Sequence, residues 1–325
     1  MTNVHFPLLD LMLFRIPGLK AKEQIELAFK FKSEDELIKI SKKDIENLLG
    51  LSLGTKTIRM EEIRKKAEND AALLLKIGIH CLSIRDQSYP PLLSEIFDPP
   101  FLLFYRGCLP DSEKPMAAVV GTRKPSSQAA KAAFELSMEL GRAGINVVSG
   151  LAMGIDAMAH RGNIEGKAAT VAVLGSSPDM VYPTANRELA RRILDTGGII
   201  LSEYAPGTSP KRWTFPARNR IISALSRGTV IVEAPEKSGA LITAQYALEQ
   251  DRDLWVHECG VNSPKGKGTA YLVQDGAKIV SSANDILCEW NLPLKGFNTA
   301  EKVQYKNSTG LSMASALAEY LEIEV

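Results

Sequence analysis

Residues 115–126 read PMAAVVGTRKPS and residues 145–156 read INVVSGLAMGID, and these two segments decide the fold class. Each begins with a short apolar run, turns at a glycine and continues into a stretch whose apolar residues have helical spacing. Apolar runs of this kind are typical of parallel strands that helices cover on both faces. Because the same alternation recurs to about residue 280, we expect an α/β fold with a Rossmann-like, doubly wound and mostly parallel sheet.

The expected strands and helices alternate along this region. Strands are expected at 117–120, 145–149, 170–174, 198–202, 229–233, 254–258 and 277–280. Helices are expected at 127–143, 153–165, 186–196, 217–226, 240–250 and 267–275. A further strand-like run lies at 101–105, after two proline pairs that favour extended or turning backbone.

The segments on either side differ from the sheet region. Residues 1–78 show helical apolar spacing interrupted by turn glycines, which predicts a small all-α domain. Its turn at 16–19 (IPGL) resembles a helix-hairpin-helix turn that holds a phosphate on backbone N–H groups, or it simply joins two packed helices. We expect a sheet domain at 79–290, then a polar linker at 291–325 with a short amphipathic helix at 311–321.

Composition indicates a cytoplasmic protein. The 325 residues are 45% hydrophobic and 24% charged, as expected for a water-soluble chain. No apolar run approaches the roughly 20 residues of a membrane helix, and the first residues do not resemble a secretory leader. Four scattered cysteines, Cys81, Cys108, Cys259 and Cys288, form no CxxC pair, so we expect reduced thiols and no metal.

Positive charge is concentrated in one segment although the net charge is only +1. Residues 121–240 contain 15 Lys and Arg against 10 Asp and Glu. Between residues 205 and 228 there is no acidic residue, and the basic ones are Lys211, Arg212, Arg218, Arg220 and Arg227. This asymmetry favours an anion-binding site, although chance clustering in a solvated loop would look the same.

Small residues follow several expected strands, at the edge where doubly wound sheets bind their ligands. The loops begin with Gly121, Thr122 and Arg123, with Ser149 and Gly150, and with Lys237, Ser238 and Gly239. Backbone N–H groups, helix N-termini and guanidinium groups together bind oxyanions. One such loop is common in α/β proteins, and GxGxxG is absent at the first loop. Several loops converging with arginines predict an anion site.

Residues 211–220 (KRWTFPARNR) interleave cations with two aromatic residues. Cations neutralise backbone phosphates, while Phe215 or Trp213 can stack on an unpaired base. The alternative is that both rings are core residues that anchor the loop. Since a duplex hides the faces of its bases, stacking favours single-stranded nucleic acid.

No catalytic apparatus or cofactor site is evident. Asp156 and His160 lie four residues apart on one expected helix, and we interpret them as a structural hydrogen bond that holds the loop after 145–149. Glu203 and Glu233 each end a strand, where they can serve in acid–base chemistry or pair with an arginine of 218–220; we favour pairing. His257 and Cys259 are too few for a metal site.

Several motifs together resemble the DprA/Smf family of DNA-processing proteins. They are GTR at 121–123, SGLAMGID at 149–156, YP at 182–183, FPARNRII at 215–222 and SGALITA at 238–244, in collinear order within about 79–282. The helical front end also resembles the sterile-alpha-motif-like domain that many members carry. The resemblance implies a cytoplasmic homodimer that coats incoming single-stranded DNA during natural transformation and loads the RecA recombinase, without catalysis.

The resemblance also implies a basic DNA pocket at Arg123, Arg212, Phe215 and residues 218–220, with 237–239 at its rim and Lys211 as an alternative to Arg212. The full set of candidate nucleic-acid-binding residues is Gly121, Thr122, Arg123, Ser149, Gly150, Lys211, Arg212, Phe215, Arg218, Asn219, Arg220, Lys237, Ser238 and Gly239. Many members end in a winged-helix domain; with 35 residues after Trp290, we expect no complete winged helix here.

Two other functions compete with DNA binding. The expected sheet also resembles that of nucleoside-monophosphate phosphoribohydrolases of the Lonely Guy type, which carry a PGGxGTxxE segment. Residues 232–241 read VEAPEKSGAL here, without the glycine pair or the glutamate. A sensor of a free nucleotide is the third hypothesis; it requires a crevice closed at both ends, whereas DNA requires an open one.

Overall fold

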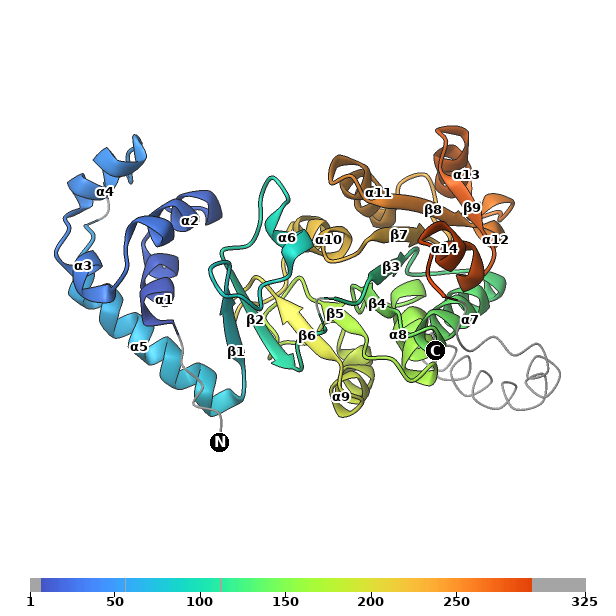
Figure 1. Cartoon of the computed structure of the whole chain (residues 1–325), viewed down its shortest axis with the longest axis horizontal. Coiled ribbons are helices and arrows are strands. Elements are labelled where there is room, and N and C mark those ends of the chain that lie inside the picture. The colour runs from blue at the N-terminus through green and yellow to red at the C-terminus, as the bar shows by residue number, and fades with distance from the viewer. Residues whose placement is uncertain (1–6, 56, 112, 294–325) are drawn as a thin grey trace.

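Five helices form the N-terminal end of the structure, a computed structural model that describes residues 7–55, 57–111 and 113–293 (Figure 1). They are α1 (Leu8–Arg15), α2 (Ala21–Lys30), α3 (Glu34–Ile38), α4 (Lys42–Leu49) and α5 (Met60–Ile77). Ser33 and Ser41 cap the N-termini of α3 and α4. Gly78 ends α5 in the left-handed conformation, which glycine adopts without steric cost. The helix predicted at 311–321 lies outside the described residues.

The rest of the described fold is built on a nine-stranded sheet, with the strand order β1-β2-β6-β5-β4-β3-β7-β8-β9. Its strands are β1 (His80–Ser83), β2 (Leu102–Gly107), β3 (Met116–Val120), β4 (Asn146–Ser149), β5 (Val171–Val173), β6 (Ile199–Ser202), β7 (Gly228–Ile231), β8 (Asp253–His257) and β9 (Lys278–Val280). β1 and β2 pair antiparallel with their neighbours, and every other pairing is parallel. The prediction of a mostly parallel, doubly wound sheet is confirmed.

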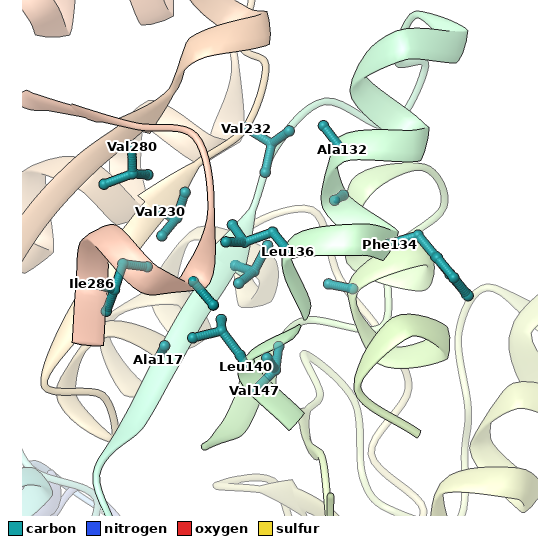
Figure 2. Packing of buried hydrophobic residues seen from close by; sticks show 14 of the residues in the cluster. Ala117, Ala132, Phe134, Leu136, Leu140, Val147, Val230, Val232, Val280 and Ile286 are labelled. Carbon is teal, nitrogen blue, oxygen red and sulfur yellow. The ribbon is translucent and has the colours of Figure 1, made fainter. Parts of the chain in front are cut away.

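Helices cover both faces of this sheet (Figure 1). One face carries α7 (Ser127–Arg142), α8 (Ile155–Glu165), α9 (Arg187–Asp195) and α14 (Ala283–Glu289), and the other carries α6 (Pro91–Ser94), α10 (Thr214–Ala224) and α11 (Gly239–Glu249). Figure 2 shows Leu136 and Leu140 of α7 packed towards Ala117, Val147 and Val230 of the strands. The turn η1 (Thr184–Asn186) precedes α9, and α12 (Glu258–Val261) and α13 (Lys267–Gln274) follow β8.

Among the described elements, five were not predicted from the sequence: β1, α6, η1, α12 and α14. β1 is an edge strand whose first two residues are only half-buried, so it lacks the apolar run of a central strand. α12 and α14 have four and seven residues, too few for helical periodicity to emerge. The seven predicted parallel strands all exist, with ends that differ by one or two residues.

β2 joins the sheet to the N-terminal helices. Leu102 and Phe104 pack with the helices, whereas Leu103 packs with the sheet core on the other side, as alternation along a strand requires. The division at residue 78 therefore falls between parts that share a core, and it stays a prediction. None of the helices in the described ranges combines the length and apolarity that crossing a membrane requires.

Candidate functional site

A crevice opens where the winding of the parallel sheet reverses. From β3 the chain adds β4, β5 and β6 on one side, then returns to place β7 on the other side of β3. Because the connections after β3 and β7 diverge to opposite faces, a space opens at the carboxyl ends of these strands. Its volume is about 590 Å³, and its walls come from those two loops and from α10 and α11.

Ten of the fourteen candidate residues line this crevice. They are Gly121, Thr122, Arg123, Arg212, Phe215, Arg218, Asn219, Lys237, Ser238 and Gly239. Arg123, Arg212 and Lys237 are exposed, and among the described residues no carboxylate forms an ion pair with them; the neighbouring Glu236 pairs with Lys267 instead. Their charge therefore remains available to an anion in the crevice.

The N-terminus of α11 also faces the crevice. Ser238 is its N-cap and accepts a hydrogen bond from the backbone N–H of Ala240, at 3.2 Å. Gly239 lines the crevice and has no other atom within 4 Å of the position that a Cβ would occupy. Since a helix N-terminus carries partial positive charge, this open backbone favours an anion there.

Arg218 lies in the floor of the crevice and is only 4% exposed. Its Nη1 donates hydrogen bonds to the carbonyl oxygens of Gly150, at 2.8 Å, and Val173. Burial lowers the pKa of Arg218 to about 10, with Arg123 acting in the same direction and Asp156 opposing it. The side chain therefore stays charged at neutral pH, holds the ends of β4 and β5 together and adds positive potential from below.

Two aromatic rings form one wall. Phe215 is half-buried, and its ring centroid lies 5.6 Å from that of Tyr182. The Arg123 guanidinium lies 5.6 Å from the centroid of Phe215, within cation–π range. Tyr182 was not among the predicted site residues, although the Tyr-Pro pair at 182–183 marked the segment. The alternative that Trp213 is a core residue was wrong, because it is 60% exposed.

The other four candidate residues do not line the crevice. The hydroxyl of Ser149 is buried and donates to the carbonyl oxygen of Val119, at 2.7 Å. Gly150 lies beneath the crevice because the Arg218 guanidinium occupies the space beside its Cα. Lys211 lies outside, 5.8 Å from the ring centroid of Trp213.

Arg220 was predicted to belong to the DNA-binding pocket, but its side chain faces away from the crevice. It forms a bidentate ion pair with Glu203, at 2.7 and 2.8 Å, and contacts Asp98. The predicted pairing of Glu203 with an arginine is therefore confirmed. The same prediction for Glu233 was wrong: its carboxylate accepts hydrogen bonds from the N–H and hydroxyl of Ser126, both at 2.8 Å, and from the Ser263 hydroxyl.

The polar residues considered for catalysis have structural contacts. Asp156 accepts a hydrogen bond from the N–H of Gly150, at 3.1 Å, so it holds the predicted loop. His160 does not serve there; its Nδ1 lies 2.7 Å from the Thr170 hydroxyl, and burial lowers its pKa to about 3. His257 caps the N-terminus of α12. Within the described ranges, no three His, Cys, Asp or Glu residues cluster as metal ligands would.

Comparison with known proteins identifies the family of the chain. A family profile described as DNA recombination-mediator protein A matches residues 80–291. The chain belongs to this DprA/Smf family. The DNA processing protein DprA of Streptococcus pneumoniae is 42% identical over 208 residues, which cover 64% of this chain and 73% of the relative. The Smf protein of Borreliella burgdorferi is 33% identical over 283 residues, 87% of this chain and 88% of the relative.

Two solved structures of the family resemble the DprA/Smf fold seen here. The crystal structure of DprA from S. pneumoniae has a TM-score of 0.72 and 34% identity, over 87% of this chain and 98% of that one. A structure of the Helicobacter pylori protein, described as revealing its single-stranded DNA binding mode, has a TM-score of 0.57 and 28% identity, over 65% of this chain and 95% of that one.

Proposed function

We propose that this DprA/Smf protein binds single-stranded DNA in the crevice between β3 and β7, and that it acts as a recombination mediator without covalent chemistry. The main observation is that the crevice combines three exposed cations, which have no carboxylate partner in the part of the chain that the structure describes, with an aromatic wall and a helix N-terminus. Arg123, Arg212 and Lys237 neutralise phosphates, and Phe215 stacks on a base. The H. pylori relative, whose structure is described as giving insight into its single-stranded DNA binding mode, supports the proposal.

The proposal extends to the partners that the family resemblance implies. The protein would work in the cytoplasm as a homodimer, protect incoming DNA during natural transformation and load RecA onto it. Analytical ultracentrifugation tests the dimer, and RecA-dependent strand exchange on coated DNA tests the loading. A monomer that binds DNA but never stimulates RecA would remove this extension and leave the binding site in place.

Nucleotide chemistry is the second candidate, because a crevice of about 590 Å³ also suits a mononucleotide. The carboxylate of Asp156 lines the crevice, but it accepts hydrogen bonds from the backbone N–H groups of Gly150 and Ala152. Glu233 is fully buried, and its carboxylate is held by Ser126 and Ser263. Incubation with nucleoside monophosphates, followed by chromatography for released base, tests this alternative.

Salt-dependent binding tests the proposed function. Three phosphate contacts predict a slope of log K against log salt of about −2 for single strands, and Arg123→Ala should reduce its magnitude by about 0.7. The Arg123→Ala substitution should lower the affinity for all DNA sequences alike, since phosphate contacts carry no sequence information. Fluorescence anisotropy with labelled single-stranded, duplex and mononucleotide ligands measures this.

The matched control is Lys131→Ala, which removes an exposed cation from α7 that pairs with Glu135. It should leave both the affinity and the slope unchanged. Equal affinity for duplex and single strands, or a slope near zero, would overturn the proposal.

A further inference from the structure

Trp213 is a large aromatic side chain in an exposed turn beside the crevice. The three residues 211–213 are all exposed, and Thr214, which follows them, is fully buried. Thr214 fixes the turn: its N–H and hydroxyl donate to the carbonyl of Lys211, at 3.0 and 2.8 Å, and its hydroxyl accepts from the Lys211 N–H, at 3.1 Å. Trp213 is therefore exposed on an ordered backbone.

The immediate surroundings of Trp213 repeat the arrangement found inside the crevice. There, the Arg123 guanidinium lies 5.6 Å from the centroid of Phe215. At the turn, the Lys211 ammonium lies 5.8 Å from the centroid of Trp213. Tyr204 contacts the indole nearly edge-on, with the ring planes at 77°. Each site thus combines a ring with a cation. One nucleotide of a single strand can use both, because its base stacks on the ring and its phosphate pairs with the cation.

Arg212 connects the two sites. Its side chain lines the crevice, whereas the side chains on either side of it in sequence do not. A strand that leaves Phe215 past Arg212 therefore meets Trp213 and Lys211 next. The stretch between residues 205 and 228 has no acidic residue to repel it.

We infer that Trp213, with Lys211, forms a second base-stacking subsite outside the crevice, so that the ligand is a strand longer than a mononucleotide. This inference rests on the proposed function and deepens it. A free nucleotide would fill the crevice without contacting Trp213, whereas a longer single strand would contact both rings.

Tryptophan fluorescence reports on Trp213 separately from the other two tryptophans. The chain has three, and Trp255 and Trp290 are 0% and 3% exposed. Thymidine oligonucleotides of increasing length should leave the emission of the full chain unchanged while they are short and quench it once they reach the turn. Trp213→Phe should abolish the quenching without abolishing binding.

Affinity measured with labelled oligonucleotides gives the second readout. Trp213→Ala should weaken binding of the longer oligonucleotides roughly 5- to 150-fold, the range for losing one stacked base. Affinity for the shortest oligonucleotides and the salt slope should stay as in the wild type, because no phosphate partner is removed. Phe29→Ala is the control, since it removes an exposed ring from α2, among the N-terminal helices.

The outcomes separate the two proposals. If the wild type binds single strands but Trp213→Ala has wild-type affinity at every length, the second subsite does not exist and the proposed function stands. If the wild type does not bind single strands at all, both proposals fail together. Thermal unfolding should show that the Trp213→Ala protein is folded, so that any loss of affinity can be attributed to the missing indole ring.

Discussion

Arg218 and Arg220 are two residues apart on α10 and face different parts of the molecule. Arg218 donates to main-chain carbonyls beneath the crevice, whereas Arg220 pairs with Glu203 and Asp98 behind it. Residues i and i+2 of a helix point in nearly opposite directions, so a basic run on a helix does not form one charged surface. Asn219, between them, donates to the carbonyl of Gly239 and ties α10 to α11.

The first prediction concerns the buried arginine. Arg218→Lys should lower the free energy of unfolding by about 2–4 kcal/mol, because an ammonium cannot satisfy both carbonyls with the planar geometry of a guanidinium. Urea unfolding measures this loss. Arg212→Ala, at an exposed position in the same crevice, should change stability by no more than about 0.5 kcal/mol. Equal stability of the two variants would show that Arg218 does not hold the strand ends.

At the scale of elements, the crevice depends on close contact between the loop after β3 and the start of α8. Gly154 precedes α8 at φ +76°, and a Cβ there would lie 2.5 Å from the carbonyl oxygen of Thr122. The N–H of Ile155 donates to that same oxygen, at 3.2 Å. The backbone that carries Arg123 is therefore positioned by a helix from the next βα unit.

The second prediction tests this contact with a pair of glycines. Gly144→Ala has the same kind of backbone strain, at φ +80°, but open space around the new methyl group, and should cost about 1 kcal/mol. Gly154→Ala should cost clearly more and should also weaken DNA binding, because the Thr122 and Arg123 backbone must move. Thermal unfolding and anisotropy measure the two effects. Similar stability and DNA affinity of the two variants would mean that the loop after β3 can move to accommodate the new methyl group at little energetic cost.

Glu233 joins three more segments around the same loop. It ends the β7 segment, and its carboxylate binds the N-cap of α7, Ser126, and the hydroxyl of Ser263 beyond α12. A buried carboxylate used in this way favours one arrangement of the loops, since each of its oxygens has a hydrogen-bond partner. Its contacts explain why it does not face the crevice.

At the scale of the whole molecule, the N-terminal helices and the sheet share one apolar cluster through β2. Phe104 is fully buried in it, with its ring 5.6 Å from that of Phe14 on α1. Asp10 of α1 forms an ion pair with Arg85, after β1, at 2.6 Å. The two parts are therefore expected to unfold together.

The third prediction follows from this shared core. Phe104→Ala should destabilise the protein by about 3–5 kcal/mol, the usual cost of removing a buried aromatic ring. Circular dichroism, which reports on the helices of both parts, and tryptophan fluorescence, whose buried rings Trp255 and Trp290 lie in the sheet part, should show one transition with the same shifted urea midpoint. Phe29→Ala, at a ring 70% exposed on α2, should leave it unchanged. A dichroism transition in two steps, only one of which coincides with the fluorescence change, would show that the N-terminal helices unfold independently.

The sequence by itself determined the sheet, its parallel strands and the glycine loops at their carboxyl ends. These features are local, because a strand buried on both faces is a continuous apolar run and a tight turn needs small residues. The same pattern predicted that the loops at 121–123 and 237–239 converge, since carboxyl ends of parallel strands meet at one edge. The placing of Arg212 and Phe215 in one pocket with Arg123 was implied by the family resemblance.

Only the tertiary structure decided which polar side chains face the crevice. It separated Arg218 from Arg220, assigned Glu233 to serines rather than to an arginine, brought Tyr182 beside Phe215 and exposed Trp213. Each of these outcomes depends on how an element is rotated against partners that are distant in sequence, such as Glu233 against Ser126. Local patterns carry no information about that rotation, because it is set by packing across the whole sheet.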